Sequence, residues 1–407
     1  MRHIGWHAAL ILVLFCYIGT PIGELFHLED DYTAAIGEAT THTVFDVLEV
    51  EKPFSFVDDE LISLEASSSK AILGYKNIPL KEVTIHSKDR PILYPSGASI
   101  GVQIEMDGVL IVGFYLLQAD GSRQLSPLGG GLEVGDRIYK LNQTEVGSVE
   151  EVMHVLQDAK GDVISIHIVR DEKEMVIDVP LQRTSLDQAK IGLYIRDSVA
   201  GIGTLTFVQE NGMFGALGHV IADGDTKLPV QIENGKVLHS RVTSIKKGAS
   251  GHPGEKLASF DRKSGYIGSV ESNTEFGIYG HAITSVLSKV MPDTGLPIAF
   301  AHEVEEAEAE IWTVVEDDKI EKFTIEIVSN KPRKHASSKG LVVKVTDARL
   351  LNKTGGIIQG MSGSPIIQDG KIIGAISHVF VNDPSRGYGC HIEWMLDEVD
   401  ALASVTN

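Results

Sequence analysis

The sequence predicts a mainly β protein. Short apolar runs recur along the chain and are separated by Asn-Gly or Asp-Gly signals, which favour tight hairpins. Such signals occur at Glu210-Asn211-Gly212, at Glu233-Asn234-Gly235-Lys236 and at Gln368-Asp369-Gly370-Lys371. The chain has 41 glycines, and helix-period patterning is sparse. From about residue 184 onward we therefore expect closed antiparallel barrels, with a helix near Ile392–Ala403 packed on them.

Length and composition limit the class of protein. The 407 residues are enough for two domains with substantial cores. A net charge of −20 argues against nucleic-acid affinity, which requires basic patches. Cys16 lies in an apolar N-terminal run and Cys390 near the C-terminus, so we expect no disulfide between them. No cluster of potential ligands has metal-site spacing, and we expect neither a metal nor a cofactor.

The N-terminus carries a separate signal. A nearly unbroken apolar run from Ile4 to Gly19 follows Arg2 and precedes an acidic stretch, Glu24 to Asp31. Its length and flanks fit a signal peptide or a signal anchor within residues 1–23. We therefore expect export and contact with a membrane through this segment. The lack of a convincing small-residue cleavage site favours slow processing or a retained anchor.

Residues 24–90 and 91–183 differ in pattern. The first segment fits equally a spacer or a small β region. The second contains Gly131–Asn142, a turn and a short strand, followed by a helix from Ser148 to Leu156 with an N-cap serine and apolar i, i+3, i+4, i+7 spacing. This order resembles a PDZ domain, which captures an extended peptide between a strand and a helix. The resemblance places the carboxylate-binding loop at Ser99, Ile100, Gly101 and Val102, although Ile100 and Val102 also suit a core.

The run Gly360-Met361-Ser362-Gly363-Ser364-Pro365 leads into an apolar hairpin, Ile366 to Gly374. Glycines on both sides of Ser362 permit backbone conformations that a Cβ would obstruct. Such a turn can aim backbone N–H groups at a single oxyanion. The pattern favours a reactive serine over an ordinary Gly/Ser turn.

A serine nucleophile needs a base. His219 ends the second of two β-type runs and has small neighbours, Gly215, Ala216 and Gly218, which leave the imidazole room in a cleft. The carboxylate partner is harder to select. Asp347 ends a strand-like run between the histidine and the serine, whereas Asp223 and Asp225 sit in a Gly-rich turn as turn formers. Position favours Asp347 over Asp223.

Taken together, these motifs resemble a chymotrypsin-clan serine protease with a PDZ domain in front of the catalytic domain. The closer resemblance is to the stage IV sporulation protein B family of signalling serine peptidases in endospore-forming Firmicutes. It is carried by TFVQENGMFGALGHVIADGDT, by VTDARLL and by GIIQGMSGSPIIQDGKIIGAISHVFVNDPSRGYGCHIEWML. The implied fold is an N-terminal membrane or signal segment, a PDZ domain (91–183) and a chymotrypsin-like double β-barrel (184–407).

The resemblance also implies a function. It assigns a triad of His219, Asp347 and Ser362, with an oxyanion hole at the N–H groups of Gly360 and Ser362. Family members cleave themselves and a regulatory membrane protein between the two forespore membranes, which leads to activation of the late mother-cell sigma factor. The PDZ groove is expected to take a peptide in cis or in trans. The alternative is a non-catalytic PDZ scaffold that keeps a protease-like barrel as a docking surface.

Overall fold

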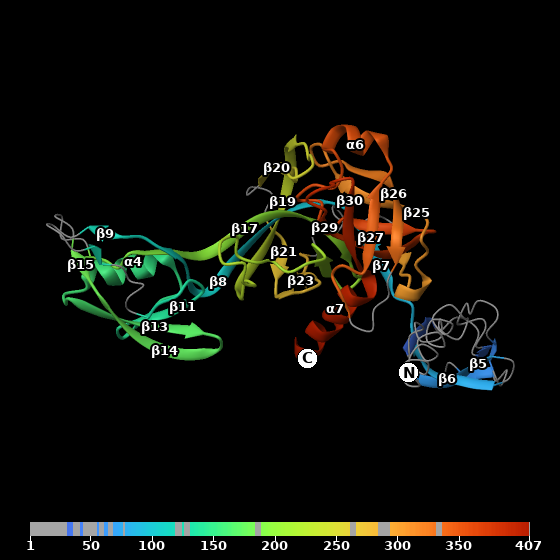
Figure 1. The fold of residues 1–407 in the computed structure, drawn as a ribbon, viewed down its shortest axis with the longest axis horizontal. Helices are drawn as coiled ribbons and strands as arrows, with labels where there is room; N and C mark the ends of the chain where they lie inside the picture. Colours follow the sequence, from blue (N-terminus) through green and yellow to red (C-terminus); the bar gives the residue numbers. More distant parts are fainter. Residues whose placement is uncertain are drawn as a thin grey trace, which may run out of the picture.

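The computed structural model describes residues 78–118, 131–183, 189–260, 266–283, 294–330 and 336–406, with short segments at 31–35, 41–43, 55–56, 61–63, 68–75 and 124–125. The expected signal or anchor segment, residues 1–23, lies outside these ranges. Within them, no helix is long and apolar enough to span a membrane. Figure 1 shows an elongated molecule with β-sheets along its length and the N-terminal strands at one side.

The N-terminal region contains a small sheet, which fits the small β region rather than a spacer. Its strand order is β1-β6-β5-β3. The bounds are β1 (Asp31–Ala35), β3 (Ser55–Phe56), β5 (Ser68–Tyr75) and β6 (Ile78–Lys88). A separate pair joins β2 (Thr41–Thr43) to β4 (Leu61–Ser63).

Two 16-residue strands, β8 (Ser99–Phe114) and β17 (Leu193–Val208), run antiparallel for most of their length. At one end they belong to a half-barrel with a core that includes Ile100, Ile104, Phe214 and Ile278. The other half-barrel strands are β7 (Ile92–Pro95), β18 (Met213–Ala216), β19 (Ile232–Lys246), β21 (Tyr266–Val270), β22 (Ser272–Thr274) and β23 (Gly277–His281). The hairpin partner of β19 is β20 (Glu255–Phe260).

At their other end β8 and β17 support the segment that resembles a PDZ domain (Figure 1). Its helix α4 (Val149–Asp158) has the predicted Ser148 cap and a complete capping box with Glu151. Its larger strands are β11 (Arg137–Leu141), β13 (Val163–Arg170) and β14 (Lys173–Pro180). Short strands complete it: β9 (Leu117–Gln118), β10 (Gln124–Leu125), β12 (Thr144–Glu145), β15 (Gln182–Arg183) and β16 (Ala189–Lys190).

This connectivity corrects the predicted domain division. The sequence places residues 91–183 in one domain and 184–407 in the next. In the structure β7 and the first half of β8 pair with β17 and β19, so residues 92–106 belong to the half-barrel. The PDZ-like segment is therefore inserted between two half-barrel strands. A continuous strand that serves two domains leaves no composition change or linker at the boundary.

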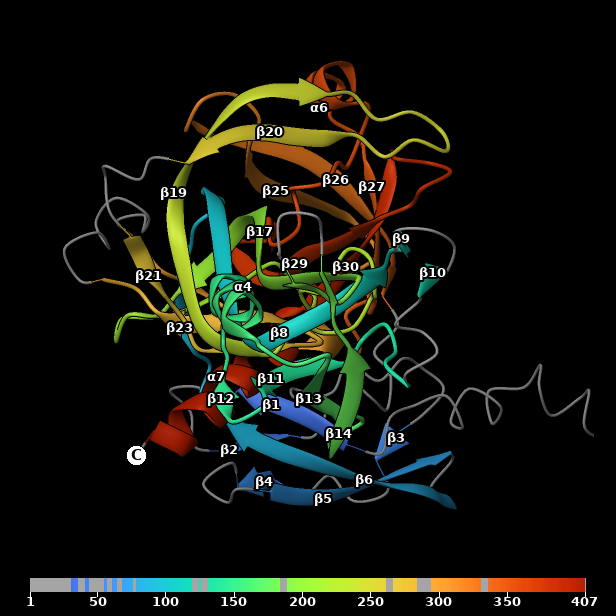
Figure 2. The ribbon, with the colours of Figure 1, turned by 90° about the vertical axis from the view of Figure 1, so that its left-hand side faces the viewer.

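The C-terminal region forms a closed six-stranded barrel, in the order β25-β26-β27-β30-β29-β28. The bounds are β25 (Glu308–Val314), β26 (Ile320–Asn330), β27 (Leu341–Val345), β28 (Pro365–Gln368), β29 (Lys371–Val379) and β30 (Arg386–His391). Other elements here are β24 (Leu296–Pro297), the 3₁₀ turn η2 (Ala301–Glu303), α6 (Ala348–Thr354) and α7 (Ile392–Thr406). The predictions of a mainly β fold with two barrel-type sheets and of a C-terminal helix are confirmed. One barrel is closed and the other is a half-barrel (Figure 2).

The predicted hairpin turns have two outcomes. Asn211-Gly212 connects β17 to β18, and Asp369-Gly370 connects β28 to β29, with positive φ at Gly212, Asp369 and Gly370. The prediction of a turn at Asn234-Gly235 is wrong, because both residues lie inside β19. Gly235 fits there because a Cβ would come within 2.5 Å of the Val270 side chain.

A buried ion pair holds the PDZ-like segment together. The Asp136 carboxylate is 1% exposed and accepts from Arg170 Nε and Nη2 at 2.6 and 2.7 Å, and from the Glu133 N–H at 2.7 Å. The Arg170 guanidinium also donates to the Gly131 carbonyl. This pair joins the end of β13 to the turn before β11.

We predict that Arg170→Met lowers the free energy of unfolding by about 3–5 kcal/mol, because it leaves the buried Asp136 carboxylate without its cation. The matched control is Arg137→Met, whose partner Asp107 is exposed and whose loss costs less than about 1 kcal/mol. Urea denaturation measures both changes. Equal losses for the two variants would contradict a special role for the buried pair.

Candidate active site

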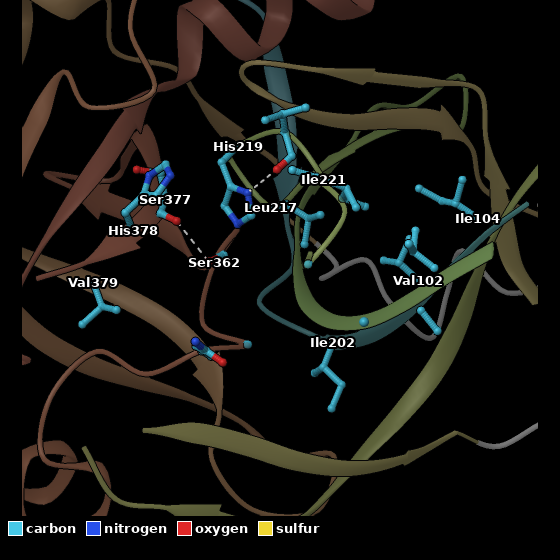
Figure 3. Close-up of a pocket in the computed structure, with 18 of the residues that line it drawn as sticks. Val102, Ile104, Ile202, Leu217, His219, Ile221, Ser362, Ser377, His378 and Val379 are labelled. Carbon is cyan, nitrogen blue, oxygen red and sulfur yellow. Dashed lines mark hydrogen bonds between the residues drawn. The ribbon is translucent and has the colours of Figure 1, made fainter. Parts of the chain in front are cut away.

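A cavity of about 870 Å³ lies between the half-barrel and the closed barrel. Figure 3 shows His219, Ser362, Ser377 and His378 on one part of its wall, opposite the apolar Val102, Ile104 and Ile202. The structure thus brings together the predicted base and the predicted nucleophile, which lie far apart along the chain. They reach the cavity from different barrels, His219 after β18 and Ser362 before β28.

The turn that carries Ser362 is fixed by backbone hydrogen bonds. The Met361 N–H donates to the Ile358 carbonyl, the Gly363 N–H to Ile376 and the Ser364 N–H to Met361. Gly363 has φ +92°, and a Cβ there would come within 2.0 Å of the Thr204 carbonyl oxygen. Only glycine allows this close approach of the half-barrel to the turn.

The same turn leaves two donors available. Gly360 adopts φ +92°, and no hydrogen bond engages the N–H groups of Gly360 and Ser362 within the described part of the chain. Alternate N–H groups on a glycine-containing turn can converge on one oxygen. The geometry is compatible with the predicted oxyanion hole at these two positions.

Ser362 and His219 are not hydrogen-bonded to each other in this structure. The Ser362 hydroxyl donates to the Ser377 carbonyl at 3.1 Å. His219 Nδ1 lies 2.8 Å from the Val220 carbonyl, so Nδ1 carries the proton and Nε2 is left as an acceptor. Activation therefore requires the Ser362 hydroxyl to leave Ser377 and turn toward the imidazole.

Burial favours the neutral form of both imidazoles in the cavity. Burial lowers the pKa of His219, and the hydrogen bond to Val220 opposes this shift only in part. The ring of His378 lies 5.1 Å from that of His219. Burial, followed by the charges of His219 and Lys339, lowers the pKa of His378 to about 4. A neutral His219 is the form that can accept a proton from serine.

Asp347 does not join this pair. It is the N-cap of α6, and its carboxylate accepts from the Arg349 N–H at 2.8 Å and from the Arg349 guanidinium at 2.7 Å. The sequence predicted that the Asp347 carboxylate would bind His219. In the structure His219 Nδ1 is hydrogen-bonded to the Val220 carbonyl instead. An aspartate directly before a helix accepts hydrogen bonds from the unpaired N–H groups of the first helical turn. Asp347 occupies this position before α6, so its carboxylate caps the helix.

Asp223 and Asp225 also form no hydrogen bond or ion pair with His219. Asp223 is 1% exposed, and one of its oxygens accepts from the N–H groups of Asp225 and Thr226 at 3.0 and 2.8 Å, as a turn former does. Both carboxylates pair with Arg196 of β17. They fix the loop after His219 to the strand that leads into the PDZ-like segment.

The prediction of a carboxylate-binding loop at Ser99, Ile100, Gly101 and Val102 is wrong. These residues lie inside β8 and pair with β17 on one side, and residues 100–102 pair with β19 on the other. Their backbone groups are thus committed to the sheet. Ile100 and Val102 fill the half-barrel core, which was the competing interpretation of those two residues.

Lys256, which no sequence motif marks, lies beneath the nucleophile turn. It is 3% exposed, and its Nζ lies 2.9 Å from the Thr313 hydroxyl and 3.5 Å from the Thr204 hydroxyl. Thr204 in turn donates its hydroxyl proton to the Gly360 carbonyl at 2.8 Å. Burial lowers the pKa of Lys256 to about 7. A buried lysine without a carboxylate partner is expensive to keep charged.

We predict that Lys256 makes stability rise with pH. The unfolded chain holds this proton up to about pH 10.5, whereas the folded chain releases it near pH 7. Between pH 7 and pH 9 the unfolding free energy should therefore increase by about 2 kcal/mol from this residue. Lys256→Met should lack that component in urea denaturation at the two pH values. Parallel profiles for the two proteins would contradict the low pKa.

A solved PDZ domain of an SdrC-like protein from Listeria monocytogenes is similar to part of the chain. The identity is 22%, over 22% of this chain and 90% of that one, with a TM-score of 0.18. No curated protein matches the chain. The model of the family described as SpoIVB peptidase S55 matches residues 187–396, which is just over half of the sequence and includes His219 and Ser362. The chain therefore belongs to the SpoIVB family of sporulation serine peptidases.

Proposed function

We propose that the chain is an endopeptidase in which Ser362 is the nucleophile and His219 the general base. The observation that carries this proposal is the meeting of both side chains in one cavity, beside the unengaged N–H groups of Gly360 and Ser362. His219 Nε2 takes the hydroxyl proton while Ser362 Oγ forms a bond to the substrate carbonyl carbon. The negative charge on the carbonyl oxygen then develops next to the two N–H groups.

The second half of the reaction uses the same groups in reverse. As the C–N bond breaks, the imidazolium delivers its proton to the leaving amine. Water then attacks the acyl-enzyme while His219 takes a proton from it. As the bond between the acyl carbon and Ser362 Oγ breaks, the imidazolium returns that proton to Oγ and the carboxylic acid product leaves. In the resting state the Val220 carbonyl takes the orienting role that a carboxylate has in the usual triad.

We propose the family's biological role for this chain. It would cleave itself and a regulatory membrane protein in the space between the forespore membranes, and so lead to activation of the late mother-cell sigma factor. The apolar run at Ile4–Gly19 supports export and anchoring of the chain at least initially. Family membership supports the signalling role.

We also propose that the PDZ-like segment binds a peptide, in cis or in trans, at a different place from the sequence prediction. The start of β17, Leu193–Arg196, pairs with β8 on one edge. Near it lies α4, whose Val149 N–H donates to Asp197 at 2.8 Å. A strand edge next to a helix is the arrangement that PDZ domains use for peptides.

One observation favours the alternative of a non-catalytic scaffold. The Ser362 hydroxyl is hydrogen-bonded to a carbonyl rather than to the imidazole. A fluorophosphonate probe separates the two functions, because it reacts with a serine only where a base and an oxyanion hole can assist.

We predict that the unaltered chain is labelled by a fluorophosphonate probe and cleaves protein substrates, and that Ser362→Ala loses both activities by at least about 1,000-fold. Circular dichroism should show an unchanged fold, since Ala fits the turn.

The matched control is Ser364→Ala. The Ser364 hydroxyl is buried and has no hydrogen-bond partner among the residues that the structure describes, so its removal should leave labelling unchanged. An unlabelled wild-type chain, or a Ser362→Ala variant that still self-cleaves, would support the scaffold instead.

A further inference from the structure

Gly360 lies between two peptide units that are both held from outside the nucleophile turn. The carbonyl before it, of Gln359, accepts from the Lys256 N–H at 2.9 Å. Its own carbonyl accepts from the Thr204 hydroxyl at 2.8 Å. In a planar trans peptide the N–H points opposite to the C=O. The bond from Lys256 to Gln359 therefore fixes the direction of the Gly360 N–H, one of the two free donors beside Ser362.

Gly360 depends on this support because it has no Cβ and adopts φ +92°. Glycine takes up many backbone conformations at similar energy, so a rotation that redirects its N–H would cost little. The aliphatic stem of Lys256 occupies the space beside it, since a Cβ at Gly360 would come within 3.1 Å of Lys256 Cβ and Cδ. Lys256 thus holds Gly360 through its main chain and packs against it through its side chain.

The end of the Lys256 side chain reaches the second of these peptide units. Its Nζ, two bonds beyond Cδ, lies 2.9 Å from the Thr313 hydroxyl and 3.5 Å from the Thr204 hydroxyl. Thr204 gives its hydroxyl proton to the Gly360 carbonyl, so the Thr204 oxygen is left to accept from Nζ. A directed chain therefore runs from Lys256 through Thr204 to Gly360. Hydrogen bonds in such a chain polarise one another.

In the described part of the chain, no carboxylate balances a charge on the Lys256 Nζ. Burial is the cause that lowers its pKa to about 7. The charged residues next to it and opposite Thr313 in the ladders are Glu255, Lys246 and Glu321. Glu255 pairs with Lys246, and Glu321 pairs with Lys319. The groups that face Nζ are therefore hydroxyls, and the effect of its proton passes to them.

We propose that Lys256 is a positioning residue of the catalytic site, which holds Gly360 and acts through the Thr204 hydroxyl to pre-organise the oxyanion hole. This inference rests on the proposed peptidase function and adds a residue to its machinery. The ammonium form acts more strongly than the amine, because a charged donor makes the stronger hydrogen bond to the Thr204 oxygen. That oxygen in turn makes its own proton a better donor to the Gly360 carbonyl.

The proposal sets a pH window for activity. His219 must be neutral to act as the base, and burial lowers its pKa below the usual 6.5. Lys256 keeps its proton in the folded chain up to about pH 7. Between these two pKa values both groups are in their active forms. As the pH rises above 7, Lys256 becomes neutral, and the rate of Ser362 acylation should fall although His219 stays neutral.

The first test uses Lys256→Met in the full chain. Methionine keeps the main-chain N–H and most of the stem but removes Nζ. The readouts are the rate of fluorophosphonate labelling of Ser362 and the cleavage of a peptide found with the unaltered chain in a proteome-derived library. At pH 6.5 we expect labelling and kcat to fall by at least about 10-fold, with KM within about twofold, because the oxyanion hole acts on the transition state.

The pH profile separates this role from a merely structural one. Between pH 6.5 and pH 8.5 the labelling rate of the unaltered chain should fall by at least about fivefold, whereas the Lys256→Met rate should stay constant. The matched control is Lys246→Met. This lysine is exposed on the neighbouring strand and pairs with Glu255, so its loss should leave the labelling rate and its pH profile unchanged.

The second test addresses the route through Thr204. Thr204→Val removes the hydroxyl with little change in shape, whereas Thr204→Ser retains it. We expect Thr204→Val to lower the labelling rate at least about 10-fold and to abolish its decline above pH 7, and Thr204→Ser to stay within about threefold. Adding Lys256→Met to Thr204→Val should lower the rate by less than about twofold further, because the two residues act in one chain.

The possible results have distinct meanings. Labelling of a folded Lys256→Met at the unaltered rate overturns the proposal, and so do independent, multiplicative losses from Lys256→Met and Thr204→Val. If Lys256→Met fails to fold by circular dichroism, the two Thr204 variants and the pH profile of the unaltered chain decide the matter. An unaltered chain whose labelling does not fall above pH 7 also contradicts the role of Lys256. An unaltered chain that is never labelled overturns the peptidase function itself.

Discussion

The contact of Thr204 with the nucleophile turn is the constraint on which the site depends. Its N–H holds the Ser362 carbonyl and its hydroxyl holds the Gly360 carbonyl, so one residue of the half-barrel fixes both ends of the turn. One further contact and one missing side-chain atom keep the approach close. The Thr206 hydroxyl donates to the Gly363 carbonyl, and Gly363 has no Cβ to block it. Because the turn belongs to the closed barrel, this contact also sets the position of one barrel against the other.

Lys256 packs against both Thr204 and the turn that carries Ser362. Its ammonium or amine group bridges the hydroxyls of Thr204 and Thr313, and its aliphatic stem packs within about 3 Å of the space that a Gly360 Cβ would fill. The Lys256 N–H also donates to the Gln359 carbonyl. Thr204, Thr206 and Lys256 therefore all fix the position of the turn. This pre-organises the free N–H groups of Gly360 and Ser362 before any substrate is present.

The strand β17 connects three parts of the molecule. Its first residues lie beside α4 of the PDZ-like segment, its middle borders the cavity, and its end carries Thr204. Arg196, between the first two regions, pairs with Asp223 and Asp225 of the loop that follows His219. The loop that follows His219 is therefore tied to the strand that also carries the PDZ-like segment.

The sequence alone determined the features that depend on neighbouring residues. The mainly β class, the capped helix after Ser148, the turns at Gly212 and Gly370 and the glycine turn around Ser362 all follow from local backbone preferences. The family could be recognised from the same motifs. The Asn234-Gly235 prediction failed because a tight-turn signal is only a preference, and pairing of β19 with β8 outweighed it.

Tertiary structure alone decided which distant groups meet. It placed Asp347 on a helix cap, gave His219 the Val220 carbonyl, buried Lys256 beneath the turn and put Ser99–Val102 inside a sheet. It also inserted the PDZ-like segment between two half-barrel strands. The contact of Thr204 with Gly360 joins residues 156 positions apart, and the insertion depends on the continuity of β8 and β17. The bonds of His219 to Val220 and of Asp347 to Arg349 are local, but which of the available partners each side chain takes was settled only in the folded chain. Apart from the motifs that marked His219 and Ser362, residue type and spacing did not indicate these contacts, because the free energy of pairing and burial is set by the whole sheet.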